Sequence, residues 1–517
     1  MTGGYPLVNV AAYLSQTARR LPTKVAFVAR QHQMTFGQLS DACDACAAGL
    51  RDAGIQKGDR VAIFEPSGLD FIVAWFGVVK LGAIAVPVNA MLKGQEVTCI
   101  LQNARVRAII VHAGLAAIIK SILGNLPCLQ QVFVSGGGAT IDAAGSRSFD
   151  DLINFRPRES VLVECEIDDV ATIIYTSGTT GVPKGAMLTH GGFESNVRDI
   201  IHVLELTEEM VRVSVTPLFH VMGLSVNLLA SVMIGATIII QPRLDLDEFL
   251  QANQQHRATM VSGAPALHHL LVHDPRPSRY DLSSWRMATS GSAPLSPVLL
   301  RQFEEKYRIP LVECYGLTEA TTLVSCNPVH GTRKPGSVGL PVPGSEVRIV
   351  DDRDHEVPAG EPGEVVVRGP AVMRGYFDDP DATAEALRGG WLHTGDVGRV
   401  DVDGYLYILD RKKDMLICSG FNVYPREIED VLMKHPAVQD AAVVGQPDAK
   451  RGENPIAFII LKPGNQASEN ELIQYCRTNL ADYKAIKAVR FLSEFPRNAN
   501  RKVLKRELRE IARAARP

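Results

Sequence analysis

The feature that most constrains this chain is an alternation of short β-rich runs with amphipathic helical patterns, over roughly the first 400 of its 517 residues. The run KVAFVA at 24–29 precedes a helical pattern that begins at Thr35, and RVAIF at 60–64 precedes the apolar stretch 71–88. Such alternation is typical of parallel sheets covered by helices. We therefore predict an α/β fold whose large N-terminal domain contains helix-covered, mostly parallel sheets.

The pattern changes between residues 340 and 410, where short strands are broken by Gly, Pro and Asp, as in GEVVVRG and GYLYILD. This predicts a small β-barrel-like or antiparallel subdomain. After the charge run DRKKD at 410–414, Pro425 opens a helical pattern, and the strand patterns AAVVG and PIAFII follow it. We predict a domain boundary near residue 411, with one domain over 1–410 and a small α+β domain over 411–517.

The charge balance excludes some classes of partner. A formal charge of −3 gives no electrostatic case for nucleic acid or an anionic membrane. The exception is the basic stretch KVLKRELREIARAARP at 502–517, where Leu504, Leu508 and Ile511 share one helical face. That pattern favours a solvated amphipathic helix.

The lack of a secretory signal pattern and the number of cysteines both favour a cytoplasmic protein. The start MTGGYPLVNV lacks the charged and apolar regions of a secretory signal, and LLASVMIGATIII is too short to span a bilayer. Nine cysteines, an odd number, favour reduced thiols. Cys43 and Cys46 form a CxxC, but they lie on an apolar helical stripe behind a capping box of Thr35 and Gln38, so buried core is favoured over a metal or redox site. We predict a cytoplasmic protein without an integral membrane segment.

The stretch YTSGTTGVPKGAMLTH at 175–190 directly follows the apolar run VATII. It is not a phosphate loop of the GxxxxGK[ST] kind, because Lys184 precedes Gly185 and the next helical pattern begins only after His190. Glycine-freed backbone N–H groups, four hydroxyls and one cation can still wrap a polyphosphate. A mobile Gly/Ser/Thr surface loop is the alternative.

TSGTTGVPKG resembles the signature loop of the adenylate-forming superfamily, which includes acyl-CoA synthetases, luciferases and peptide-synthetase adenylation domains. The resemblance covers essentially the whole chain, because five more motifs of that superfamily follow in its order. They are SGSAPL at 290, YGLTEAT at 315, GWLHTGD at 390, DRKKDMLICSGFNVYPREIE at 410 and RNANRKVLKREL at 497. It implies an adenylation domain over 1–410 with the ATP and acyl pocket, and a mobile C-terminal domain over 411–517.

The reaction that this resemblance implies joins a carboxylate to the α-phosphorus of ATP, releases pyrophosphate, and then passes the acyl group to a thiol. Because both first reactants are anions, the site must neutralise charge and align the attack. The implied requirements are ATP and coenzyme A as substrates, Mg²⁺ and a small carboxylic acid. The oligomeric state stays open between monomer and homodimer.

The resemblance also assigns nucleotide-binding positions. Those implied to hold the β- and γ-phosphates are Thr176, Ser177, Gly178, Thr179, Thr180, Gly181 and Lys184. Those implied around adenine are Ser292, Ala293, Pro294, Tyr315 and Gly316, and those around the ribose are Asp396 and Arg411. Judged on residue pattern alone, YGLTEAT would be a turn followed by a helix start, and Asp396 a turn aspartate.

Three residues are implied to be catalytic: Thr318 near the α-phosphate, Glu319 on Mg²⁺, and Lys502 between the carboxylate and the α-phosphate. An ammonium at Lys502 offsets charge that develops during attack, so it raises rate more than affinity. The family usually has glycine immediately before this lysine, whereas this chain has Arg501. The alternative for Lys502 is a lysine at a basic helix start.

The second half-reaction is implied to need rotation of the small domain. Lys413 matches the hinge position, and Ser419, Gly420 and Phe421 match the segment that approaches the thiol tunnel.

PLFHVMGL at 217–224 resembles the segment that walls the acyl pocket. Relatives that activate amino acids place an aspartate after the phenylalanine, where this chain has His220, which favours fatty or aromatic acids. The positions assigned to the pocket are Phe219, His220, Gly223, Ala264 and Gly291. We predict a coenzyme A ligase for a fatty acid of medium to long chain. The alternatives are an aryl-acid ligase, transfer to a carrier protein, an amine or oxygen, and a catalytically silent binding protein.

Overall fold

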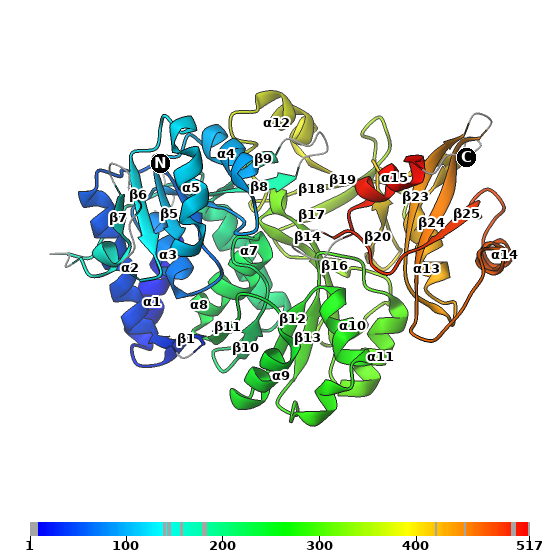
Figure 1. Ribbon diagram of the computed structural model, residues 1–517, viewed down its shortest axis with the longest axis horizontal. Coiled ribbons are helices and arrows are strands. Elements are labelled where there is room, and N and C mark those ends of the chain that lie inside the picture. The colour runs from blue at the N-terminus through cyan, green and yellow to red at the C-terminus, as the bar shows by residue number, and fades with distance from the viewer. Residues whose placement is uncertain are drawn as a thin grey trace.

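The computed structural model describes residues 9–30, 32–137, 141, 146–155, 159–177, 183–418, 421–448, 451–497 and 503–514. It has a large N-terminal domain with three sheets and a smaller C-terminal domain with a fourth (Figure 1). This confirms the predicted α/β class. The boundary at residue 411 stays a prediction.

The first large sheet has seven strands, and its pairs are parallel except for β8 and β9. In spatial order they are β7 (Ser146–Ser148), β6 (Gln131–Ser135), β5 (Ala108–His112), β3 (Arg60–Phe64), β4 (Ile84–Pro87), β8 (Val170–Ser177) and β9 (Pro183–Thr189). Alternate residues of β3 face opposite cores, one with α2 (Phe36–Asp52) and α3 (Leu69–Lys80), the other with α4 (Gly94–Asn103) and α5 (Ala116–Ile122). Burial on both faces explains the apolar runs read from the sequence.

The second large sheet has nine strands, and antiparallel pairing is confined to β2, β15 and β16. In spatial order they are β16 (Leu340–Pro341), β15 (Thr322–Cys326), β14 (Leu311–Leu317), β13 (Met287–Ser290), β12 (Met260–Gly263), β10 (Val211–Ser214), β11 (Thr237–Ile240), β1 (Val25–Ala29) and β2 (His32–Thr35). One face packs on α9 (Leu246–Gln255), α10 (Pro265–His273) and α11 (Pro297–Tyr307). The other packs on α1 (Ala12–Arg20), α7 (His190–Val203), the π-helix η3 (Gly223–Leu229) and α8 (Ala230–Ile234).

The subdomain predicted to be β-barrel-like or antiparallel is a four-stranded antiparallel sheet. Its strands are β17 (Glu346–Val350), β18 (Gly363–Arg368), β19 (Leu392–Val400) and β20 (Leu406–Arg411), and α12 (Pro380–Ala386) precedes β19. The C-terminal sheet contains β21 (Leu416–Cys418), β22 (Phe421–Val423), β23 (Val438–Asp448), β24 (Gly452–Leu461) and β25 (Ala488–Phe491). One face packs on α13 (Pro425–Leu432) and α14 (Glu469–Asn479), the other on α15 (Lys505–Ala514).

Several local predictions can be checked directly. Cys43 and Cys46 are fully buried, and Thr35 and Gln38 form the capping box. The predicted stripe on the C-terminal helix is wrong at Ile511, which is 42% exposed. The helix packs through Leu508 and Ala512, an i,i+4 pair on one face, against the sheet instead. Within the described ranges, no helix is both long and apolar enough to cross a membrane.

Candidate active site

The glycine-rich stretch connects β8 and β9, an antiparallel hairpin in which Thr176 pairs with Lys184. The apolar run VATII is therefore the buried part of β8, and the strand continues into the hydroxyl-rich segment as far as Ser177. Four predicted phosphate-binding residues lie outside the described residues, as does the side chain of Ser177; the four are Gly178, Thr179, Thr180 and Gly181.

Tyr376 connects this hairpin to the YGLTEAT motif. The Lys184 ammonium lies 5.2 Å from the centroid of the Tyr376 ring, and the Tyr376 hydroxyl donates to Glu319 Oε1 at 3.0 Å. The backbone holds Tyr376 there, because Phe377 N donates to Gly185 O at 2.8 Å. Burial, and then Glu319, raise the pKa of Tyr376. Sequence reasoning missed Tyr376, since nothing in RGYFDDP indicated that it would pair with a strand 190 residues earlier.

The YGLTEAT motif has a strained backbone. A Cβ added at Gly316 would lie 1.4 Å from the carbonyl oxygen of Thr322, so only glycine fits there. Thr321 has φ 54° and Thr322 has φ 127°, which is an outlier for a β-branched residue. Thr318 is buried at the start of a 3₁₀ turn. Such strain is frequent at functional sites, where the surrounding structure holds it.

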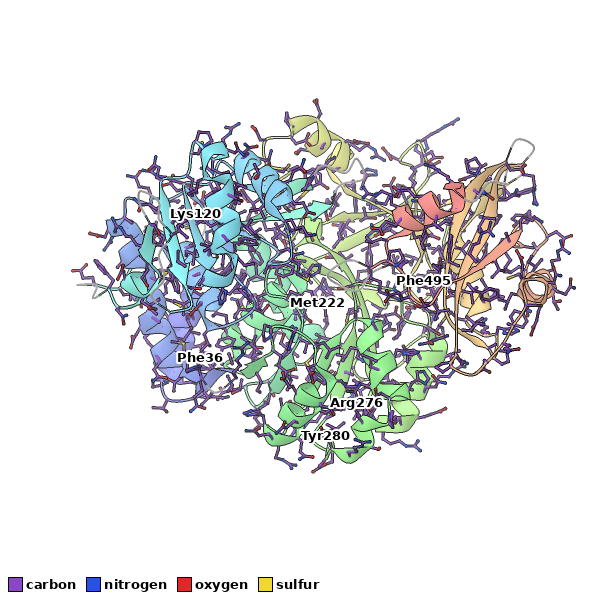
Figure 2. All side chains as sticks on the ribbon, viewed as in Figure 1. Phe36, Lys120, Met222, Arg276, Tyr280 and Phe495 are labelled. Carbon is purple, nitrogen blue, oxygen red and sulfur yellow. The ribbon has the colours of Figure 1, made fainter. Side chains whose placement is uncertain are left out.

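The SGSAPL motif lies against the part of β14 that directly precedes YGLTEAT. Leu295 N donates to Glu313 Oε1 at 3.0 Å, and a Cβ added at Gly291 would lie 3.5 Å from Cys314 O. Ser292 has φ 66°, and its hydroxyl contacts Met222 Sδ at 3.4 Å. Figure 2 shows Met222 near the centre of the molecule. The motif predicted around adenine therefore touches the segment predicted around the acyl group.

A carboxylate joins two more predicted positions. Tyr315 Oη donates to Asp396 Oδ2 at 2.6 Å, and Arg411 Nε lies 3.4 Å from Asp396 Oδ1. Asp396 and Arg411 are register partners in β19 and β20, which explains how residues fifteen apart in sequence meet. Burial is the main cause that raises the pKa of Tyr315, and the Asp396 charge adds to it.

The predicted acyl segment folds back on itself. A Cβ added at Gly223 would lie 2.1 Å from Pro217 O, so a side chain there would prevent the turn. Thr322 Oγ1 donates to Val221 O at 3.2 Å, which fixes the segment against the strained threonine pair. Burial lowers the pKa of His220 to about 4, so its imidazole is neutral at pH 7.

The structure also places Phe219 of this segment, two more residues of SGSAPL, and the predicted pocket position Ala264. Phe219 and Ala293 are half-buried, whereas Pro294 of SGSAPL is exposed. Ala264 follows β12 directly and caps the N-terminus of α10.

Contacts around the predicted hinge divide at Lys413, whose side chain is exposed. On one side, Lys412 N donates to Gly395 O at 2.8 Å, and Lys412 Nζ pairs with Asp352 at 2.9 Å. On the other side, Asp414 pairs with Arg509 of α15. Lys412 is thus bound to the four-stranded subdomain, and Asp414 to the C-terminal helix.

The remaining predicted positions belong to the C-terminal domain. Phe421 is 55% exposed and stacks on Tyr483 with ring centroids 4.6 Å apart. Ser419, Gly420, Arg501 and Lys502 lie outside the described residues.

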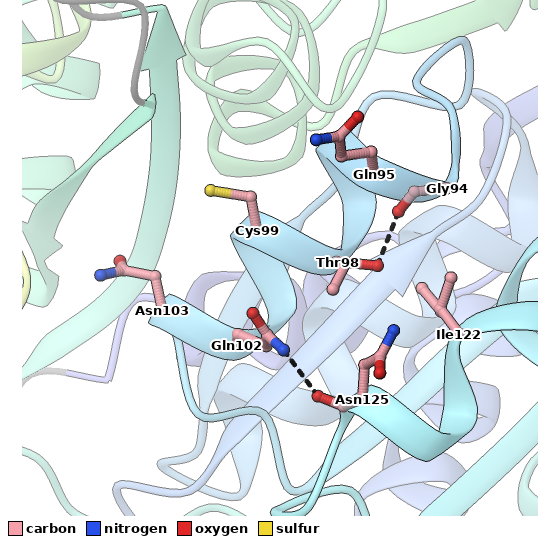
Figure 3. Close-up of a pocket in the computed structure, with 8 residues that line it drawn as sticks. All are labelled: Gly94, Gln95, Thr98, Cys99, Gln102, Asn103, Ile122 and Asn125. Atoms are coloured by element: carbon pink, nitrogen blue, oxygen red, sulfur yellow. Dashed lines mark hydrogen bonds between the residues drawn. The ribbon is translucent and has the colours of Figure 1, made fainter.

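A separate pocket of about 650 Å³ lies on α4, with Ile122 and Asn125 on its other side (Figure 3). Its connection to the site is the hydrogen bond from Tyr175 Oη to Asn103 Oδ1 at 2.5 Å, which joins α4 to the strand before the glycine-rich stretch. No predicted site residue lines this pocket.

Comparison with known proteins decides the family. Residues 14–377 match the family of AMP-binding enzymes, and residues 427–502 match the AMP-binding enzyme C-terminal domain. The chain belongs to the AMP-binding enzyme family. This AMP-binding enzyme is an ATP-dependent acyl-CoA ligase, as the motifs predicted, and its substrates are ATP, coenzyme A and a small acid.

Three relatives of this AMP-binding enzyme illustrate the similarity. A long-chain-fatty-acid–CoA ligase of Escherichia coli O6:H1 is 36% identical, covering 96% of this chain and 93% of the relative. A 3-[(3aS,4S,7aS)-7a-methyl-1,5-dioxo-octahydro-1H-inden-4-yl]propanoyl:CoA ligase of Mycobacterium tuberculosis is 36% identical, covering 98% and 99%. The crystal structure of an anthranilate CoA ligase with anthranoyl-AMP superposes with a TM-score of 0.92 at 32% identity, covering 99% and 98%.

Proposed function

We propose that this ligase activates a fatty acid of medium to long chain as its acyl-adenylate and transfers the acyl group to coenzyme A. The observation that carries this proposal is the double attachment of the segment Pro217–Leu224. Val221 accepts a hydrogen bond from Thr322, the residue directly after YGLTEAT, and Met222 contacts Ser292 of SGSAPL. An acyl group held by this segment lies beside a nucleotide held by those motifs, so the carboxylate and the α-phosphate can meet.

The geometry supports the following proposed contacts with the nucleotide. Tyr315 presents an aromatic ring for adenine, and its hydroxyl holds Asp396, whose carboxylate accepts the ribose hydroxyls. Lys184, with the hydroxyls of Thr176 and Ser177, binds the β- and γ-phosphates and releases them as pyrophosphate. Lys184 and Glu319 share Tyr376 as a neighbour, the first at its ring and the second at its hydroxyl.

Glu319 is the proposed protein ligand of Mg²⁺. Its carboxylate has a hydrogen-bond donor on Oε1, and within the described residues no three metal-binding side chains cluster together. This fits Mg²⁺, which takes few ligands from a protein and the rest from phosphate and water. Bound there, the ion would neutralise phosphate charge.

Lys502 is the proposed catalyst of adenylation. Rotation of the C-terminal domain about Lys413 would then remove Lys502 from the site and bring Phe421 and its neighbours there for thioester formation. Lys412 is bound to the four-stranded subdomain and Asp414 to α15, which supports a hinge at Lys413 between the predicted domains 1–410 and 411–517. Arg411 and Lys412 would stay with the first domain while the residues after Lys413 move. The hydrogen bond from Arg426 N to Asp410 Oδ2, 3.0 Å, would have to break on rotation.

The acyl group faces a neutral His220, which favours an uncharged group beside the reacting carboxylate. The relatives' names span long-chain fatty, bicyclic dioxo and anthranilate substrates, so an aryl acid is the second candidate. The test is a panel of fatty and aryl acids with ATP and coenzyme A, read by mass spectrometry. Fatty acyl-CoA should dominate, and exclusive formation of aryl-CoA would contradict the fatty-acid assignment.

A further inference from the structure

Arg212 in β10 is a buried cation without a counter-ion. Its side chain is 1% exposed, and no carboxylate pairs with it among the residues that the structure describes. Nη1 donates to Val226 O at 2.8 Å and to Asn227 Oδ1 at 3.1 Å, while Nε and Nη2 have no hydrogen-bond partner. Burial lowers the pKa of Arg212 to about 10, so the guanidinium remains charged at neutral pH. Buried, unpaired donors of a charged group are costly and call for an acceptor.

The sheet register places Arg212 on the face toward η3. Arg212 pairs with Ile238 in β11 and Met260 in β12, and Met260 pairs with Met287 in β13. These three partners belong to the core that η3 shares with the sheet. Both acceptors of Arg212 are residues of η3, the π-helix that begins at Gly223, where the predicted acyl segment ends. Short π-helical turns are frequent at functional sites.

The path from the reacting edge to Arg212 is polar. Strands β12 and β13 end at the predicted pocket, since Ala264 and Gly291 directly follow them, and β10 ends at Ser214, five residues before Phe219. Arg212 lies two residues before the end of β10, about 7 Å below that edge. Residues with hydroxyl groups lie between Arg212 and that edge. Ser214 Oγ accepts from Asn227 at 2.9 Å, and Thr289 Oγ1 donates to Ser262 Oγ at 3.0 Å. These polar groups would contribute nothing to the binding of a purely hydrocarbon chain.

We propose that Arg212 is a specificity-determining residue, which binds a hydrogen-bond-accepting oxygen at the end of the acyl group remote from the reacting carboxylate. The preferred substrates are then oxo or dicarboxylic acids rather than plain alkyl acids. This inference rests on the proposed function, because it requires an acyl group between η3 and the sheet. A ketone and a second carboxylate supply the same acceptor chemistry.

The test compares octanoic acid, 7-oxooctanoic acid and octanedioic acid with the wild-type protein, each as kcat/KM for acyl-CoA formation. A hydrogen bond to a charged donor predicts that at least one oxygen-bearing acid exceeds octanoic acid by about 10- to 100-fold. The two oxygen-bearing acids distinguish ketone from carboxylate. If octanoic acid is the better substrate or all three are equal, the inference is wrong and the proposed function stands. If no acid yields a thioester, the proposed function is wrong, and the inference that rests on it is wrong as well.

Variants separate recognition from a structural role in holding η3. Arg212→Met should abolish the preference, bringing the ratio of kcat/KM values to about one, whereas Arg212→Lys keeps the charge and part of the preference. Met260→Leu changes the register partner without touching the charge, so the ratio should stay as in the wild type. A purely structural arginine would lower kcat/KM for all three acids equally in Arg212→Met. If that variant does not fold, the wild-type ratio alone decides.

Discussion

The hydroxyl of Tyr315 donates a 2.6 Å hydrogen bond to the carboxylate of Asp396, and this contact joins two motifs that are 81 residues apart in the sequence. The carboxylate also faces Arg411 across the β19–β20 ladder, so it is held from both sides. A carboxylate fixed in this way is preorganised to accept a pair of hydroxyls.

Asp396→Ala should therefore raise the KM for ATP about tenfold or more, because hydrogen bonds to a charged acceptor are lost. Tyr315→Phe keeps the ring and removes only the hydroxyl, so its effect on this KM should be smaller. Both are measured by ATP/pyrophosphate exchange at saturating acid. A larger effect on the KM for the acid than on that for ATP would contradict the ribose assignment.

Glu319→Gln should slow pyrophosphate exchange about 100-fold, the range typical for loss of one electrostatic partner of a reacting group. Tyr376→Phe is the matched control, because it removes the donor on Glu319 Oε1 and leaves the carboxylate in place. Titration with Mg²⁺ should require more metal for the Gln variant than for the control. Equal requirements in the two variants would argue against a metal ligand.

Lys502→Ala should slow adenylation by about 100-fold or more and leave thioester formation from supplied acyl-adenylate largely intact. The reason is that the ammonium acts on charge that develops only during attack on the α-phosphate. The two half-reactions are measured separately by stopped assays. Equal loss in both would remove Lys502 from its catalytic role.

Lys505 and Glu429 form an ion pair of 2.8 Å with side chains that are 19% and 18% exposed. Lys505→Met leaves Glu429 mostly buried without its cation, so it should lower the free energy of unfolding by about 2 kcal/mol. The control is Arg368→Met, whose pair with Glu346 is exposed and should contribute less than about 1 kcal/mol. Urea unfolding measures both, and equal shifts would contradict this ranking.

Glu65 should make stability fall as pH rises. Burial raises its pKa to about 8, and the Ser135 hydroxyl donates to it at 2.8 Å. Between the unfolded pKa near 4.5 and pH 8, the folded state binds the proton that the unfolded state has lost, so this group destabilises the fold by up to about 1.4 kcal/mol per pH unit. Glu65→Gln should therefore gain stability relative to the wild type between pH 6 and pH 8. Parallel pH profiles of the two urea midpoints would show that Glu65 is ionised throughout.

The sequence predicted those parts of the molecule whose structure is determined by residues close together in the chain. Alternation of apolar runs predicted helix-covered, mostly parallel sheets, and a capping box identified the start of α2. The motifs predicted which segments would meet, and the contacts of Met222 with Ser292 and of Tyr315 with Asp396 agree with that grouping.

What the sequence did not predict depends on strand pairing over long separations. Tyr376 reaches the site because its segment pairs with β9, and Arg212 is notable only because the sheet buries it without a partner. Ile511 was misplaced because the helical stripe was counted from Leu504, whereas α15 begins at Lys505 and docks through Ala512. Such outcomes are set by tertiary packing rather than by local pattern.

The most direct test of the two-step account is ATP/pyrophosphate exchange with a fatty acid present and coenzyme A absent, followed by addition of coenzyme A. We predict acid-dependent exchange in the first stage, and acyl-CoA with AMP in equal amounts in the second. Absence of acid-dependent exchange, or AMP release that is indifferent to coenzyme A for every acid, would contradict the account.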